Sequence, residues 1–174
     1  MPDYIPAWTE DGRLEQVEKL DAHRRGLKHP AISVFVLDGK GGTLLQRRAA
    51  GKYHCAGMWA NACCTHPFQH ETPAAAADRR MGEELGLSLP LRHVGQIEYR
   101  ADVGGGMIEH EVVEVFVATV DPAALRPAPN PAEVSATRWA PVADLRADAA
   151  ANPQHYAPWL RIYLAEHGAL IFGD

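Results

Sequence analysis

The sequence predicts an α+β fold, an α/β/α sandwich in which helices cover a mixed β-sheet. Two observations carry this prediction: apolar and β-branched runs occur on both sides of one well-capped helical segment, and a second helical pattern follows them. Strands and helices in this irregular order should share one core. At 174 residues with 47% hydrophobic composition, the chain is expected to form a single domain over residues 1–174.

The strands are expected in two groups, one before and one after the central helix. The predicted strands are residues 31–38, 43–48, 93–100, 109–120 and 135–140. Glycine-containing turns at 39–42 and 104–106 should join the first and second pairs as hairpins. The proline-rich segment 122–131 should form a surface loop.

Two helices are expected. Thr72 is suited to the N-cap, Pro73 to the first helical position and Gly86 to the C-terminal stop, which predicts a helix over 73–85. Apolar residues at helical spacing predict another helix over 155–167.

Composition excludes several function classes. The net charge of −5 argues against non-specific binding to nucleic acid or to an anionic membrane, because polyanions are held mainly by excess Lys and Arg. The sequence has neither an apolar run long enough to span a bilayer nor a pattern typical of a signal peptide, so a cytoplasmic protein is expected. Three cysteines without an export signal are expected to be reduced thiols.

The helix predicted over 73–85 carries the first chemical pattern. Residues three and four apart share a helix face, so Arg79 can brace Glu83 while Arg80 and Glu84 project together. Glu84 can then hold a hard cation such as Mg²⁺, which prefers carboxylate and phosphate oxygens. The alternative is a solvated helix surface with salt bridges and no ligand.

The run from Glu71 to Leu87 resembles the signature of the Nudix superfamily. The resemblance implies a Nudix-like fold and a site for a diphosphate compound. The sequence departs from the signature at Thr65, where a glycine belongs, and at Arg80, which replaces the first glutamate of an Arg-Glu pair. The lost carboxylate weakens the prediction of a hydrolase, because such enzymes use several helix glutamates to hold metal and activate water.

Further motifs surround this helix: Trp59 to Pro67 (WANACCTHP), Tyr99-Arg100, Glu109 to Glu111, and Glu18-Lys19 followed by His23. In this order they resemble the type 1 isopentenyl diphosphate isomerases, a family with the Nudix fold. The resemblance extends from about residue 10 to about residue 165. It implies a small-molecule diphosphate substrate, and we expect a monomer or weak dimer without nucleic-acid or membrane partners.

The resemblance implies one set of metal ligands. These are His23, His29, His66, Glu109 and Glu111. Imidazoles with carboxylates suit Mn²⁺, Zn²⁺ or a similar ion, in addition to Mg²⁺ held by Glu84. Strand alternation places Glu109 and Glu111 on one face and His110 on the other. His29 follows His23 at a shorter spacing than is usual in the family.

The resemblance also implies catalytic and substrate-binding residues. Cys64 and Glu111 match the two groups, one acid and one base, of a reaction that protonates an alkene at one carbon and deprotonates it at another; the sequence leaves open which of them donates first. Tyr99 matches an active-site tyrosine. Trp159 matches an aromatic residue whose π face stabilises a cation, although an aromatic on such a helix is as often a core residue. The cations for the diphosphate are Lys19, Arg48, Lys52 and Arg80.

Three alternatives stay open on sequence. Cys55, Cys63, Cys64 and His66 can form a structural zinc site, although adjacent cysteines seldom reach one tetrahedral ion. The helix alone also fits a Nudix hydrolase acting on a nucleoside or other diphosphate. A metal-binding or ligand-sensing module on the same fold is the third alternative.

Overall fold

A computed structural model describes residues 3–173, so Met1, Pro2 and Asp174 of the expected domain lie outside the described residues. Its centre is a seven-stranded mixed sheet whose order is β5-β4-β3-β8-β7, with β6 paired to β3 and β9 paired to β4. The strands are β3 (His29–Leu37), β4 (Gly42–Arg48), β5 (Trp59–Asn61), β6 (Cys63–Thr65), β7 (Arg92–Gly104), β8 (Met107–Thr119) and β9 (Val134–Pro141). The β3–β8 pair is parallel, and it joins the two strand groups that the sequence separates.

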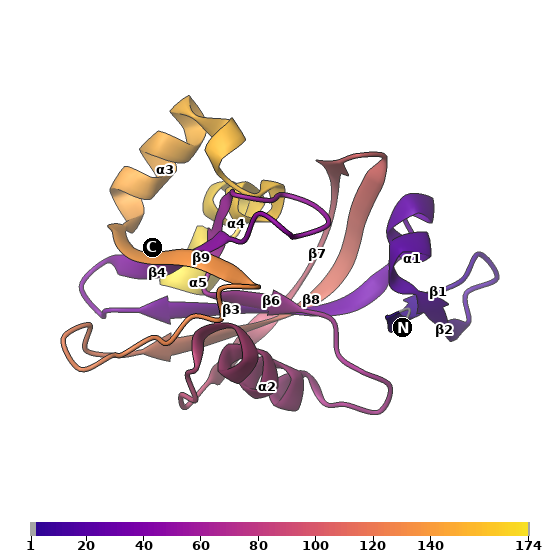
Figure 1. Cartoon of the computed structure of the whole chain (residues 1–174), viewed down its shortest axis with the longest axis horizontal. Helices are drawn as coiled ribbons and strands as arrows, with labels where there is room; N and C mark the ends of the chain where they lie inside the picture. Colours follow the sequence, from indigo (N-terminus) through magenta and orange to yellow (C-terminus); the bar gives the residue numbers. More distant parts are fainter. Residues whose placement is uncertain (1–2, 174) are drawn as a thin grey trace.

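Helices cover both faces of this sheet (Figure 1). One face packs on α2 (Pro73–Leu85) through Ile32 and Val34, and the other packs on α4 (Pro158–Glu166) through Ala31 and Phe35. Odd and even residues of β3 therefore serve two cores, because successive side chains of a strand point to opposite faces. This confirms the predicted α+β sandwich.

The central helix forms over the predicted residues. The Thr72 side chain accepts a hydrogen bond from the backbone N–H of Ala75 at 3.2 Å. Gly86 ends α2 at φ +63°, a left-handed conformation that favours glycine. Local capping chemistry is therefore sufficient to place this helix.

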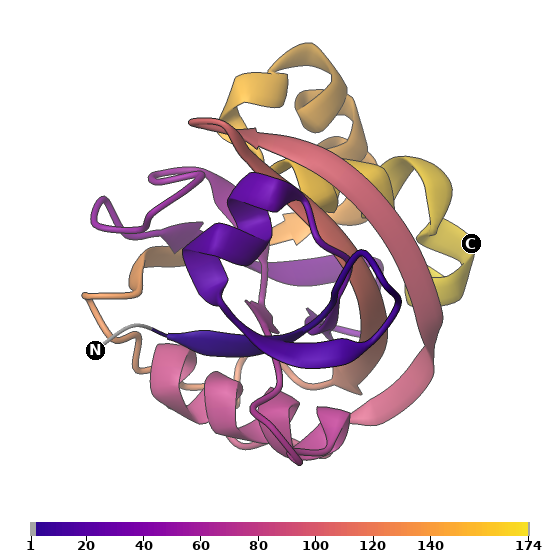
Figure 2. The ribbon, with the colours of Figure 1, turned by 90° about the vertical axis from the view of Figure 1, so that its right-hand side faces the viewer.

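An N-terminal segment that the sequence did not predict closes one end of the sheet. It comprises a hairpin of β1 (Tyr4–Trp8) and β2 (Leu14–Glu18), followed by α1 (Lys19–Arg25). Figure 2 shows α1 and the hairpin in front of the long curved strands β7 and β8. A small core of Ile5, Ala7, Ala22 and Leu27 holds the segment together, which brings α1 next to the start of β3.

Two local predictions were right in kind and wrong in extent. The helix expected over 155–167 begins only at Pro158, after a 3₁₀ turn η1 (Pro153–His155), because the residue before a proline avoids helical backbone and Ala157 is extended at ψ 138°. The expected β3–β4 hairpin is joined by a single residue pair, Leu37 with Thr43, and β4 pairs mainly with β9 and β5.

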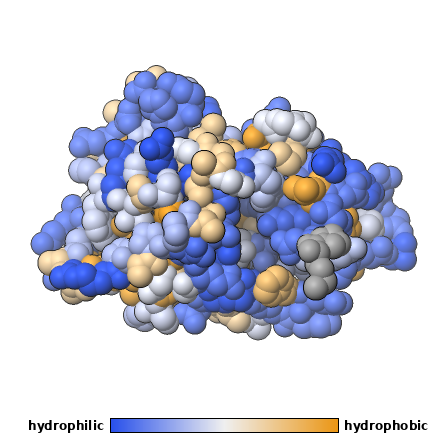
Figure 3. Space-filling model, viewed as in Figure 1, coloured by the Kyte–Doolittle hydropathy of each residue, from blue (hydrophilic) through white to orange (hydrophobic). Residues whose placement is uncertain are grey.

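Two more helices, α3 (Val142–Ala151) and α5 (Gly168–Phe172), complete the layer on the α4 side. The face of the molecule in Figure 3 is mostly hydrophilic, with apolar side chains scattered over it. Within residues 3–173, none of the helices combines the length and the apolar character needed to cross a membrane.

Candidate active site

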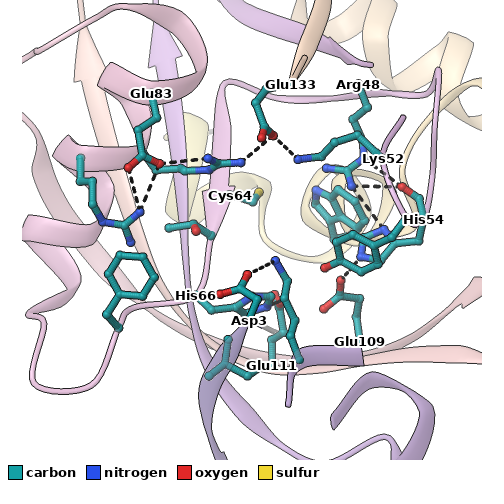
Figure 4. A pocket seen from close by; sticks show the side chains of 18 of the residues that line it. Asp3, Arg48, Lys52, His54, Cys64, His66, Glu83, Glu109, Glu111 and Glu133 are labelled. Atoms are coloured by element: carbon teal, nitrogen blue, oxygen red, sulfur yellow. Dashed lines mark hydrogen bonds and ion pairs between the residues drawn. The ribbon is translucent and has the colours of Figure 1, made fainter. Parts of the chain in front are cut away.

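A cavity of about 390 Å³ opens between the N-terminal segment, the sheet and α2. Its lining includes all the residues predicted to act in catalysis or substrate binding: Lys19, Arg48, Lys52, Cys64, Arg80, Tyr99, Glu111 and Trp159. Figure 4 shows that its labelled side chains come from separate elements and converge on one space. The sheet brings them together because Ser33 of β3 pairs with Cys64, and His29 of β3 pairs with Glu111.

One end of the cavity carries a buried histidine and carboxylate cluster. The ligating atoms of His23, His29, His66 and Glu109 all lie within 4.8 Å of one another. His23 Nε2 and His29 Nε2 approach Glu109 Oε2 at 3.3 and 3.5 Å. The fifth predicted ligand, Glu111, lies beside them, with its Oε1 3.0 Å from His66 Nε2. The shorter spacing between His23 and His29 is accommodated because α1 ends at Arg25, with Gly26 as its C-cap, and β3 begins at His29.

The donor atoms of this cluster fit a divalent cation. His23 Nε2, His29 Nε2 and Glu109 Oε2 are buried and have no hydrogen-bond partner, a state that costs about 1–3 kcal/mol per group. The other ring nitrogens are anchored, since Nδ1 of His23 lies 2.5 Å from the Lys19 carbonyl oxygen and Nδ1 of His29 lies 2.8 Å from that of Leu27. Each Nδ1–H can donate to its carbonyl and leave the Nε2 lone pair free for a metal.

Burial of the cluster also affects the third imidazole. Burial is the main cause that lowers the pKa of His66, to about 4, and it outweighs the opposing contact with Glu111. A neutral imidazole is the form that ligates metal. Glu109 and Glu111 share the buried face of β8, whereas His110 on the opposite face lies 3.3 Å from Glu98. The predicted alternation along this strand is therefore present.

The Cys64 thiol lies on the same face of the sheet, in a network of hydrogen bonds. It donates to Asn61 Oδ1 at 3.2 Å and lies 3.2 Å from Ser33 Oγ. The Tyr163 hydroxyl is in turn 2.8 Å from Ser33 Oγ. Burial raises the pKa of Cys64 to about 12, although its two polar contacts act in the opposite direction. The thiol therefore keeps its proton at neutral pH, as a general acid must.

The Glu111 carboxylate is anchored at both oxygens. The Tyr99 hydroxyl donates to Oε2 at 2.7 Å, and His66 contacts Oε1. Tyr99 stands directly opposite Glu111 in the β7–β8 ladder, which explains why two residues far apart in sequence meet. Burial raises the pKa of Tyr99 well above its usual value, so its hydroxyl remains a donor.

The opposite end of the cavity is rich in ion pairs. Arg80 Nη2 lies 2.9 Å from Glu84 Oε1, which agrees with the predicted pairing across one helix turn. Glu84 is buried, and its other oxygen accepts a hydrogen bond from Gln46 Nε2 at 2.7 Å. Lys52 Nζ lies 3.9 Å from Glu84. Arg79 contacts Glu83 as predicted but makes its shorter contact, 2.7 Å, with Glu71.

Trp159 forms a wall of the cavity and is only 3% exposed. Its indole N–H donates to Asn61 Oδ1 at 3.2 Å, and the guanidinium of Arg48 lies 5.2 Å from its ring. Trp159 is therefore both a core residue and a cavity residue, so the two interpretations of this side chain are compatible.

Four polar residues of the site were not predicted from the sequence. Ser33, His54, Asn61 and Glu133 are each in contact with a predicted site residue. Asn61 stands within the Trp59 to Pro67 motif, but the sequence does not say which atoms its amide contacts. Ser33 and Glu133 lie 31 and 53 residues from their partners Cys64 and Arg80, so no local pattern indicates them.

The cysteines of the alternative zinc site lie in different surroundings. Cys63 is fully buried on the α2 face of the sheet, and Cys55 Sγ lies 3.8 Å from the Val103 carbonyl oxygen. In residues 3–173, the group of side chains close enough to share an ion is made of histidines and Glu109, without a cysteine. This argues against a zinc site built from the cysteines.

Comparisons with known proteins identify the family. The model of the NUDIX domain matches residues 27–160. An isopentenyl-diphosphate Delta-isomerase from Dinoroseobacter shibae is 56% identical over 99% of this chain and 97% of its own length. The chain belongs to the isopentenyl-diphosphate Delta-isomerase family. An isopentenyl-diphosphate Delta-isomerase from Rhodobacter capsulatus, 55% identical over 98% of this chain and 96% of its own, leads to the same assignment.

Membership of the isopentenyl-diphosphate Delta-isomerase family confirms the resemblance drawn from the motifs and favours the isomerase over the hydrolase alternative. Solved structures agree on the fold. A MutT NUDIX hydrolase from Burkholderia pseudomallei superposes with a TM-score of 0.61 at 24% identity, over 79% of this chain and 95% of that one. At this identity the likeness shows the fold alone.

Proposed function

We propose that the chain interconverts isopentenyl diphosphate and dimethylallyl diphosphate, with Cys64 and Glu111 as the two groups that move protons. The observation that carries this proposal is the pairing of a protonated thiol with an anchored carboxylate on one cavity, whose other end is cationic. A hydrolase needs an activated water and several helix carboxylates. Here Arg80 takes the place of one of them.

Two cations complete the proposed site. His23, His29, His66, Glu109 and Glu111 would hold Mn²⁺ or Zn²⁺, since imidazoles with carboxylates suit these ions. Buried atoms of His23, His29 and Glu109 that have no hydrogen-bond partner support a cation here. Glu84 would hold Mg²⁺ shared with the diphosphate. When bound, the cations neutralise buried carboxylate charge and fix the orientation of these side chains.

The proton transfers are assigned to residues of the chain. The Cys64 thiol gives its proton to the terminal methylene carbon of isopentenyl diphosphate, which leaves a tertiary cation on the neighbouring carbon. Glu111, held by Tyr99, removes a proton from the adjacent CH₂ group, and the double bond forms there. The reverse reaction uses the same two groups in opposite roles.

Two further features support a reaction through a cation. The indole face of Trp159 offers π density beside the cavity, which stabilises positive charge. Lys19, Arg48, Lys52 and Arg80 would bind the diphosphate, so the hydrocarbon end enters the buried part of the cavity near Cys64. Exclusion of water there protects the cation from capture.

Turnover in heavy water tests the assignment. The metal-loaded protein, incubated with isopentenyl diphosphate and Mg²⁺, should yield dimethylallyl diphosphate carrying deuterium, detected by NMR. Cys64→Ala and Glu111→Gln should each abolish this product, whereas Cys55→Ala, a buried thiol with no polar contact except a carbonyl, should retain it. Release of inorganic phosphate or a monophosphate instead of the isomer would support the hydrolase and contradict the proposal.

A further inference from the structure

Glu133 occupies a position at the cationic end of the cavity that the reaction does not explain. It lies just before β9, and its side chain is 26% exposed. One carboxylate oxygen, Oε2, contacts both Lys52 Nζ and Arg80 Nη2, the latter at 2.6 Å. Figure 4 shows the Glu133 carboxylate pointing toward Lys52 in the cavity. Two of the four side chains proposed to bind diphosphate are therefore already paired with an anion of the protein itself.

The cations at this point are already offset by carboxylates of the protein. Lys52 and Arg80 contact three of them, those of Glu133, Glu84 and Glu83. Arg48 keeps its positive charge, since its guanidinium donates to a neutral acceptor, the His54 carbonyl oxygen, at 3.1 Å. A free anion that reaches Lys52 and Arg80 meets cations whose charge is already offset by carboxylates.

The backbone fixes Glu133 in this position. Its N–H donates to the Asn130 carbonyl oxygen at 2.9 Å, and its own carbonyl accepts from the Ala49 N–H at 2.9 Å. The same Ala49 accepts, through its carbonyl oxygen, a hydrogen bond from the Lys52 N–H at 3.2 Å. Glu133 and Lys52 are therefore tied to one turn, and only a side-chain rotation can move the carboxylate away from the lysine.

We propose that Glu133 is an internal counter-anion that makes diphosphate binding depend on a divalent cation. Phosphate oxygens that reach Lys52 and Arg80 must displace the Glu133 carboxylate and leave it nearby, where like charges repel. A divalent cation removes this repulsion, because it binds phosphate and carboxylate oxygens together. A diphosphate that carries Mg²⁺ is then accepted, and one without metal is selected against. The inference rests on the proposed role of Lys52 and Arg80.

Isothermal titration with inorganic diphosphate tests this role, in excess Mg²⁺ and with all Mg²⁺ removed. Glu133→Gln keeps the size of the side chain and removes its charge. In the absence of Mg²⁺, this variant should bind diphosphate about tenfold more tightly than the parent protein, or about 1.4 kcal/mol. In excess Mg²⁺, the gain should disappear or reverse. A residue with a merely structural role would weaken binding in both conditions.

The matched control is Glu98→Gln, which also removes one negative charge but pairs with Lys28 and His110 on the surface. It should leave both affinities unchanged. Equal gains in the two variants, or no gain in Glu133→Gln, would overturn the counter-anion. A third variant, Lys52→Ala, shows whether the diphosphate site itself is placed correctly. If this variant binds diphosphate in Mg²⁺ as well as the parent protein does, Lys52 does not bind diphosphate, and both the proposed site and the counter-anion role of Glu133 are rejected.

Discussion

Replacement of Asn61 by alanine should destabilise the protein more than any surface substitution, because this amide joins the Cys64 thiol to the Trp159 indole. The side chain is fully buried and makes four hydrogen bonds. Its Nδ2 donates to two carbonyl oxygens, of Val34 and Cys63, both at 3.0 Å. Its Oδ1 accepts from Cys64 and from Trp159. One amide therefore sets the positions of both side chains.

The expected loss follows from what remains after truncation. The Trp159 indole N–H would be buried without an acceptor, which costs about 1–3 kcal/mol, and the space left by the amide adds the loss of close packing. Asn61→Ala should lower the free energy of unfolding by about 3 kcal/mol, measured by urea denaturation. Asn130→Ala is the control, since that exposed side chain accepts a single bond from Ala132 and should cost below about 1 kcal/mol. A loss for Asn61→Ala no larger than the control would refute the reasoning.

Three further predictions concern the metal, the base and the acid. His23→Ala should lower affinity for Mn²⁺ by more than about a hundredfold in a chelator competition, because a buried ligand is lost; unchanged affinity would contradict the metal cluster. Tyr99→Phe should lower kcat about tenfold at unchanged metal content, since it removes one hydrogen bond to Glu111; full activity would exclude this positioning role. At pH 8, iodoacetamide should modify Cys64 about a thousandfold more slowly in the folded than in the urea-unfolded protein, because its pKa rises from 9.0 to about 12; equal rates by mass spectrometry would contradict the raised pKa.

Local chemistry made part of the fold predictable from sequence. The helix over 73–85 is bounded by Thr72 and Gly86, whose capping roles depend only on neighbouring residues. Strands 109–120 and 93–100 were predicted with nearly the right limits, because their apolar alternation and the intervening glycines are both local. The N-terminal hairpin was not predicted, because its apolar residues become buried only by packing against Ala22 of α1 and the following Leu27.

The same distinction applies to the site. The order of the motifs was enough to propose Cys64 and Glu111 as the two proton-moving groups, because the family resemblance places these two residues in one site. The contacts of Glu133 with Lys52 and of Asn61 with Trp159 depend on which strands pair. The first two residues are separated by 81 positions in the sequence and the second two by 98, so no local pattern predicts either contact. The parallel pairing of β3 with β8, which assembles the metal cluster, is likewise a property of the whole sheet.

A crystal structure of the metal-loaded protein with isopentyl diphosphate tests the central claim most directly, because this saturated analogue binds without reacting. The hydrocarbon chain should lie between Cys64 Sγ and the Glu111 carboxylate, within about 4.5 Å of each. The diphosphate should contact Lys52 and Arg80. A hydrocarbon chain bound elsewhere, with solvent between the thiol and the carboxylate, would contradict the account.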